Sequence, residues 1–105
     1  MSEITKDPTT KIGRVRLITG DKYEEALFFN DDEIQAFISL HDGDLKLAAA
    51  EALETMASME AVIQKKIQQL DLRTDGPAVA NALREHAKRL REEAYTDPAF
   101  EVFNN

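Results

Sequence analysis

The side chains most concentrated for chemistry are three consecutive acids, Asp31, Asp32 and Glu33. Carboxylates could hold a cation, but consecutive residues of a helix point in different directions, and no further ligand follows at the spacing of a calcium loop. Acids in the first turn of a helix instead stabilise its positive end. We therefore interpret the three residues as the start of a helix, and we expect an acidic surface there and no metal site.

The two histidines are the next candidates. His41 precedes Asp42, Gly43 and Asp44, and this group could be a metal corner or a general base oriented by a carboxylate. A histidine at the end of a helix, however, also suits the helix dipole. His86 falls on the expected packing side of a later helix, where we expect it at the boundary between core and solvent. We expect neither histidine to be a ligand or a catalytic group.

Other chemistry is excluded by residues that the chain lacks. It contains no cysteine, which excludes disulfides, thiol catalysis and cysteine-ligated zinc. It has no glycine-rich phosphate loop, no HExxH sequence and no nucleophile elbow. The sequence therefore predicts a protein that is not an enzyme, with no catalytic residues, no cofactor and no bound metal.

One long stretch organises the expected fold. Residues 44–70 contain no glycine or proline and are rich in alanine, leucine, methionine, glutamate, glutamine and lysine, which favour helix. Their apolar positions step by three and four, so they form one stripe that needs partner helices. The sequence predicts a single continuous helix here, about 39 Å long at 1.5 Å per residue.

A short helix is expected before it. Asp7 is a typical N-cap, Pro8 suits the first helical position, and Gly20 suits the residue that ends a helix. The alternation of polar and apolar residues over 14–17 also permits a strand. We favour the helix because both of its end signals agree.

Two more helices are predicted from their ends. Asn30 and Glu33 have the spacing of a capping box, and Gly43 ends the helix that begins there. Thr74 or Asp75 can cap a last helix. Its apolar stripe of Val79, Ala82, Leu83, Ala87, Leu90 and Ala94 should lie antiparallel against the long helix.

These elements predict an all-α fold, a small bundle of about four helices around one long central helix at about 44–70. We expect a flexible N-terminus over 1–7, a single helical domain over 8–95 and an extended C-terminal tail over 96–105. No apolar run approaches the ~20 residues of a membrane span, and the N-terminus lacks the order of a signal peptide. We therefore expect a soluble protein made in the cytoplasm.

The charge is unevenly distributed. The net charge is −7, yet residues 21–60 alone hold eleven acids and two lysines. This acidity opposes general binding to nucleic acid, because phosphate contacts need clustered lysine and arginine. It is compatible with copies that pack acidic surface against basic surface, and equally with a solvated face that aids solubility.

The C-terminal residues are unusually apolar for a tail. Phe100, Val102 and Phe103 follow a proline, and they could fold back over the bundle or dock into a neighbouring chain. Phe28, in an expected loop, poses the same question.

Five groups of residues, in this order and spacing, carry a family resemblance. They are Val15-Arg16-Leu17-Ile18 before Gly20-Asp21, Phe29 before Asp31-Asp32-Glu33-Ile34, Leu47-Ala48-Ala49-Ala50 with Ala52-Leu53, Asp71-Leu72 with Thr74-Asp75, and Ala82-Leu83 with Ala87 and Arg89-Leu90-Arg91. Together, over about residues 14–95, they resemble the head–tail connector, or neck adaptor, proteins of tailed bacteriophages and prophages. Each group alone is ordinary capping and packing sequence, so the resemblance lies in their combination.

The resemblance implies a structural virion protein, a ring-forming connector between the portal and the tail or stopper proteins. The implied partners are further copies of the chain, the portal and the tail-side neck proteins, with no membrane and no specific nucleic acid, although genome DNA passes through the ring. The implied location is the virion neck, after synthesis in the host bacterial cytoplasm. The resemblance implies no catalytic residue in this chain.

We expect the subunit or portal interface to include apolar and basic side chains, and the acids to line the surface or the channel. The interface candidates are Phe100, Val102, Phe103, Arg84, Lys88, Arg91 and Phe28, and the acidic candidates are Asp31, Asp32 and Glu33. Two alternatives remain. One is a small acidic helical regulatory protein that binds one cytoplasmic partner, and the other is an acidic DNA mimic or nucleic-acid-associated protein.

Overall fold

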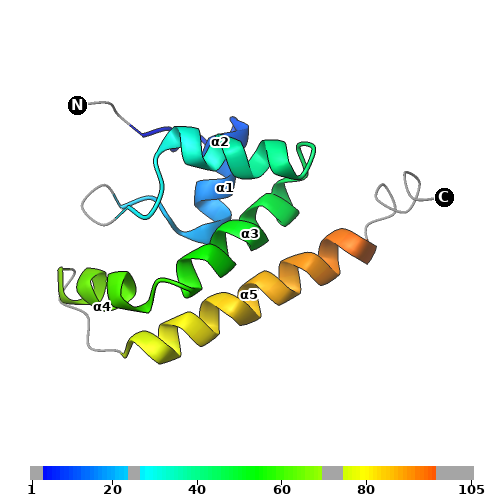
Figure 1. Cartoon of the computed structure of the whole chain (residues 1–105). Coiled ribbons are helices and arrows are strands. Elements are labelled where there is room, and N and C mark those ends of the chain that lie inside the picture. The colour runs from blue at the N-terminus through cyan, green and yellow to red at the C-terminus, as the bar shows by residue number, and fades with distance from the viewer. Residues whose placement is uncertain (1–3, 24–26, 70–74, 97–105) are drawn as a thin grey trace.

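Helices make up the regular structure of the chain. The computed structural model describes residues 4–23, 27–69 and 75–96, and within them no strand occurs (Figure 1). The helices are α1 (Lys11–Thr19), α2 (Asp31–Leu40), α3 (Leu45–Ala57), α4 (Glu60–Gln69) and α5 (Gly76–Thr96). The predicted all-α bundle is confirmed, whereas the tail predicted over 96–105 lies, after Thr96, outside the described residues.

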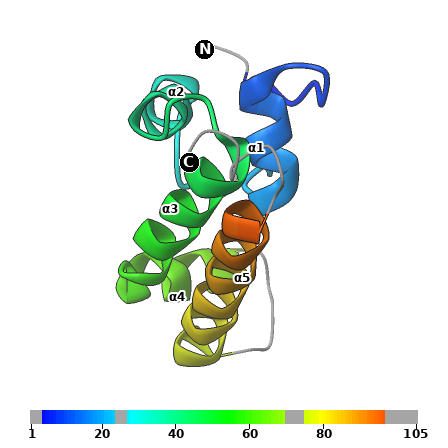
Figure 2. The same cartoon turned by 90° about the vertical axis from the view of Figure 1, so that its right-hand side faces the viewer.

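Helix α3 is the centre of the bundle. It packs against α1 and α2 on one side and along α5 on the other, and α5 runs back beside it in the opposite direction (Figures 1 and 2). The α3 residues Ala48, Ala49, Ala50 and Ala52 are completely buried. Their small side chains let the neighbouring helices approach closely, so α1, α2 and α5 meet α3 at this alanine-rich stretch.

The predicted continuous helix over 44–70 is wrong, because the chain leaves the helix at Ser58 and Met59. The Ser58 N–H donates to Glu54 O (3.1 Å) and Thr55 O (3.2 Å), and the Met59 N–H donates to Met56 O (3.0 Å). Bonds to the third preceding residue tighten the last turn and end the helix. Helix α4 then begins in a new direction at Glu60 (Figure 1).

Contacts with other elements explain this break. The Ala57 carbonyl accepts a hydrogen bond from Nη2 of Arg84 on α5 (3.3 Å). The new direction of α4 buries Ile63 and Ile67 together with Ala57 and Ala80, in a second small core. Because no glycine or proline marks this point, tertiary packing has overridden local helix propensity.

Helix α1 forms as predicted, but its start differs. The N-cap is Thr10, whose hydroxyl accepts from the Gly13 N–H (3.0 Å), and not Asp7. The Asp7 carboxylate instead accepts from the N–H (2.9 Å) and hydroxyl (2.7 Å) of Thr9, in a turn before the helix. This turn lies so close to α1 that a Cβ on Gly13 would fall 1.9 Å from the Asp7 carbonyl oxygen. Gly20, at φ 80°, ends α1 as predicted.

The predicted starts of α2 and α5 are confirmed, whereas α2 ends at Leu40 with His41 as its C-cap, before the predicted Gly43. Asn30 and Glu33 form a capping box at the start of α2. The carboxylate of Asp44 accepts from Leu47 N–H at the start of α3, and that of Asp75 accepts from Ala78 N–H at the start of α5. On α5 the buried stripe contains Ala80, while the predicted Ala82 is exposed.

Candidate functional site

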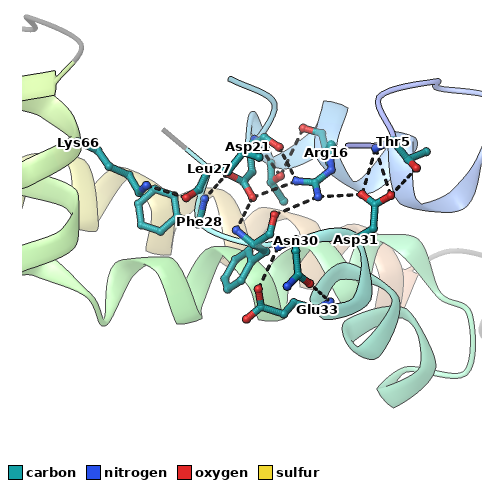
Figure 3. Close-up of polar contacts among 11 residues, drawn as sticks. Thr5, Arg16, Asp21, Leu27, Phe28, Asn30, Asp31, Glu33 and Lys66 are labelled. Atoms are coloured by element: carbon teal, nitrogen blue, oxygen red, sulfur yellow. Dashed lines mark hydrogen bonds and ion pairs between the residues drawn. The ribbon is translucent and has the colours of Figure 1, made fainter. Parts of the chain in front are cut away.

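The main polar feature of the fold is a buried arginine that the sequence analysis did not single out. Arg16 on α1 is completely buried. Its Nη1 donates to the Asp21 carbonyl (3.0 Å) and carboxylate (3.3 Å), and its Nη2 donates to Phe29 O (3.0 Å) and to the Asp31 carboxylate (3.0 Å) (Figure 3). One guanidinium therefore joins the end of α1, the following loop and the first residue of α2.

Asp21 reaches Arg16 because Gly20 turns the chain. The left-handed backbone of Gly20 ends α1 and directs the chain back toward it. The Asp21 carboxylate also accepts the backbone N–H groups of Phe28 (2.8 Å) and Phe29 (3.1 Å). Burial raises the pKa of Asp21 above its ordinary value, and these two N–H groups, with Arg16, oppose that rise without cancelling it.

Asp31 connects the cluster to the N-terminal segment. Its carboxylate accepts from the Thr5 N–H (3.1 Å) and hydroxyl (2.5 Å) in addition to Arg16. Burial disfavours the charged form of Asp31, but the hydrogen bonds from Thr5 and Arg16 outweigh it and lower the pKa. The carboxylate is thus a shared acceptor for α1 and for the segment before it.

Lys66 holds the same loop from the other side. Its Nζ, on α4, donates to Leu27 O (2.6 Å) and lies 4.9 Å from the centroid of the Phe28 ring (Figure 3). A cation over an aromatic face is attracted to it. The loop that joins α1 to α2 is therefore fixed at both ends, by Arg16 and by Lys66. We call Thr5, Arg16, Asp21, Asp31 and Lys66 the Arg16 cluster.

The Arg16 cluster sets the relative orientation of three helices. Arg16 and Asp21 are buried, Asp31 and Lys66 are partly buried, and the four bind one another, Thr5 or backbone groups. This arrangement fixes the positions of α1 and α2 and therefore of their outward surfaces. In the ranges 4–23, 27–69 and 75–96, no group of three His, Asp or Glu side chains is placed to hold a metal ion.

The three predicted acids differ in their surroundings. Asp31 is bound in the Arg16 cluster, and its side chain is 31% exposed. Asp32 and Glu33 are exposed, and Glu33 accepts from the Asn30 N–H in the capping box (3.0 Å). The structure therefore separates the acids, and only two of them belong to an outward surface.

The predicted interface residues on α5 are partly engaged within the chain. Arg84 bonds Ala57 O and Asn81, and Arg91 forms an ion pair with Glu54 of α3. The Glu54 hydrogen bond raises the pKa of Arg91. Lys88 is exposed. Phe28 is half-buried against the core and Lys66, and the predicted residues Phe100, Val102 and Phe103 lie outside the described residues.

The histidines lie near helix surfaces. His41 Nε2 is 3.2 Å from the Glu51 carboxylate, across the corner between α2 and α3. This partner is on α3, ten residues away, and not among the neighbouring acids that the sequence analysis considered. His86 is half-buried, at the boundary where it was expected.

A sequence signal for Arg16 existed but was outweighed. Residues 12, 15, 16 and 19 lie on one side of a helix, so a helix over this segment places Arg16 toward the core. The alternation of residues 14–17 indicates only a possible strand and assigns no partner to Arg16. Asp21 and Lys66 carried no comparable signal, since each binds backbone groups of a loop in addition to one side chain, Arg16 for Asp21 and Phe28 for Lys66.

Comparisons with protein-family models, with curated proteins and with solved structures give no significant match to this chain. None of the helices in the described part is both long and apolar enough to cross a membrane.

Proposed function

We propose that this protein is a head–tail connector subunit of a tailed bacteriophage or prophage. In this role, copies of the chain form a ring between the portal and the tail or stopper proteins in the virion neck. The proposal rests on the resemblance carried by residues 14–95, in which five groups of residues follow in a set order. It concerns a structural role and assigns no catalytic group.

One observation supports the proposal most strongly. Arg16, Asp21, Phe29 and Asp31 come from two separate groups that carry the resemblance, and they meet in the Arg16 cluster. The resemblance therefore includes the residues that set the geometry of α1, the loop and α2. Residues that merely favour helix would resemble many helical proteins, whereas residues that meet around one buried arginine are specific to one arrangement.

The alanine-rich group supports it in the same way. Ala48, Ala49, Ala50 and Ala52 fill the space where α3 meets its neighbours, and Ala87 of a later group lies in the same core. A ring subunit must be rigid, because each copy presents two different surfaces to its neighbours at a fixed angle. Close packing of small residues provides this rigidity.

Mass measurement tests the proposal. The purified chain should be measured by mass photometry, alone and mixed with the portal protein encoded in the same genome. We expect one closed assembly on the portal, with many copies of the chain. A chain that never binds the portal and instead forms a stable 1:1 complex with a host cytoplasmic protein would contradict the proposal.

A further inference from the structure

The outward side of α1 is basic and partly apolar. Lys11, Arg14 and Leu17 lie at steps of three along its exposed side, and Leu17 is 56% exposed. Residues 8–20 contain no acid. Within the described ranges, no carboxylate forms an ion pair with Lys11 or Arg14. Arg14 Nε donates to the Pro8 carbonyl (3.3 Å), so its bond within the chain leaves its positive charge without a carboxylate partner among the described residues.

The outward side of α2 is complementary in charge to the outward side of α1. Asp32 and Glu33 are exposed at one end of the helix, and Leu40 is 70% exposed at the other. Residues 30–45 contain five acids and no lysine or arginine. This surface thus combines negative charge with an apolar side chain, as the α1 surface combines positive charge with one.

Helix α5 is a weaker candidate for the basic surface. Its Arg91 is paired with Glu54, and Arg84 is bonded to the Ala57 carbonyl. The remaining exposed cations, Lys88 and Arg89, are interspersed with Glu85, Glu92 and Glu93. The α5 surface is therefore mixed in charge, while the surfaces of α1 and α2 each carry one sign.

The two helices that carry these surfaces occupy different positions on the bundle, and Lys11 Nζ lies beside Gly43, just after α2. Figure 2 shows α1 and α2 at opposite edges of the bundle, with α3 between and below them. A contact between two different surfaces repeats from copy to copy and can close into a ring. Within one chain, Arg16 binds the Phe29 carbonyl and Asp31 and so holds α1 and α2 at a fixed angle to each other.

We propose that α1 of one copy docks against α2 of the next, with Lys11 and Arg14 facing Asp32 and Glu33, and with Leu17 and Leu40 at the contact. This inference rests on the proposed function and names the subunit surfaces. It assigns the exposed acids of α2 to the contact between copies and not to the lining of a channel.

Paired charge reversals test the inference. One variant carries Lys11→Glu and Arg14→Glu, and the other carries Asp32→Lys and Gln35→Lys, which spares the capping residue Glu33. The control carries Lys88→Glu and Arg89→Glu on α5, with the same change in charge as the first variant. Circular dichroism checks that each variant is folded, and sedimentation velocity over a concentration series measures self-association.

Each α1 or α2 variant alone should self-associate at least about tenfold more weakly than the wild type, because like charges then face each other. A mixture of the two variants should recover assembly, since each then offers the other a complementary surface. The α5 control should assemble like the wild type. Recovery in the mixture cannot come from a loss of folding, which no second variant would repair.

Other results separate this inference from the proposed function. If wild type and both variants bind the portal as equal rings, the named surfaces are wrong and the connector role stands. If the charge variants behave as expected but the assembly never binds the portal, the surfaces stand and the connector role fails. A wild-type chain that stays monomeric alone and with the portal overturns both.

Discussion

Arg16 is a cation with a completely buried side chain. A buried cation loses its hydration, and this loss is offset only when partners with good geometry surround it. Four acceptor atoms from three residues provide these partners, and only Nε has none among the described residues. Removing Arg16 would in turn leave Asp21 buried without its cation.

Replacing Arg16 by methionine should therefore strongly destabilise the fold. We expect Arg16→Met to lower the free energy of unfolding by about 3–5 kcal/mol, as for a buried ion pair that loses one partner. Urea denaturation of the purified protein measures this value. The matched variant Arg14→Met, on the exposed side of the same helix, should change it by less than about 0.5 kcal/mol. Equal effects for both variants would contradict the structural role of Arg16.

The two carboxylates bound to Arg16 should respond oppositely to pH. The pKa of Asp31 is lowered on folding, so its contribution to stability is present above the ordinary value of 3.8 and is lost as the pH falls through the folded pKa. The pKa of Asp21 is raised on folding, so wild type gains stability from this group as the pH falls through that raised pKa.

Two asparagine variants measure these contributions. Asp31→Asn should cost about 1–3 kcal/mol near pH 7, and its difference from wild type should shrink at pH values below 3.8. For Asp21→Asn the difference from wild type should grow on acidification. Urea denaturation at several pH values between about 7 and 3 gives both differences. If the difference for Asp21→Asn shrank on acidification, that result would contradict a raised pKa of Asp21 in the folded protein.

At the scale of single residues, the sequence predicted the side chains and glycines that cap nearby helix ends. Asn30, Glu33 and Gly20 cap helices as expected, because capping depends on near neighbours. Arg16 was not predicted, since its partners become neighbours only after Gly20 turns the chain and α2 is placed. Local spacing contains no information about that placement.

Among the helices, the break between α3 and α4 is the point where tertiary contacts outweigh propensity. A break at Ser58 and Met59 makes Glu60 the first residue of a new helix. At that position proline is well tolerated, whereas in the middle of a helix it removes a hydrogen bond and clashes with the preceding turn.

Proline substitution therefore distinguishes a break from a continuous helix. We expect Glu60→Pro to change the free energy of unfolding by less than about 1 kcal/mol, and Lys65→Pro, inside α4, to lower it by about 3 kcal/mol or more. Thermal and urea denaturation measure both variants. A loss of similar size for Glu60→Pro would mean that residues 45–69 form one helix after all.

Lys66 connects α4 to the loop before α2, and its loss should act locally. We expect Lys66→Met to increase hydrogen exchange at the amides of Phe28 and Phe29, because the neighbouring Leu27 carbonyl loses its partner. The overall loss of stability should be about 1–2 kcal/mol. Lys65→Met, on the exposed side of the same turn, should leave the exchange of these amides unchanged.

The sequence predicted the existence of the helices better than their bounds. Periodicity and end signals placed α1, α2 and α5, because these helices have capping residues at their ends. The break after Ala57 has no such residue, and its cause is the Arg84 contact and the burial of Ile63 and Ile67. A prediction of that break requires knowledge of where α5 lies.

As a whole molecule, the described part is flat, with extents of 47 × 32 × 18 Å. The net charge of the full chain, −7, makes like copies repel at long range, so a specific contact between opposite charges must overcome a general repulsion. The outward surfaces of α1 and α2 provide such a contact at short range.

Salt should then weaken the proposed assembly. Raising ionic strength screens exposed charge pairs, and we expect the dissociation constant for self-association to rise about tenfold between 0.05 and 0.5 M salt. Sedimentation velocity at several salt concentrations measures this dependence. Assembly driven by apolar contact would be unchanged or strengthened, and that result would contradict the charge-based contact.

The partners of Arg16 lie close to it in the sequence, and this has a consequence for folding during synthesis. Asp21, Phe29 and Asp31 lie only 5, 13 and 15 residues after Arg16. Loops of this length close quickly, and a chain leaves the ribosome from its N-terminus onward. We expect the contacts between α1 and α2 to be available while the ribosome is still adding α5, so the nascent chain can orient its first two helices before it receives the helix that covers α3.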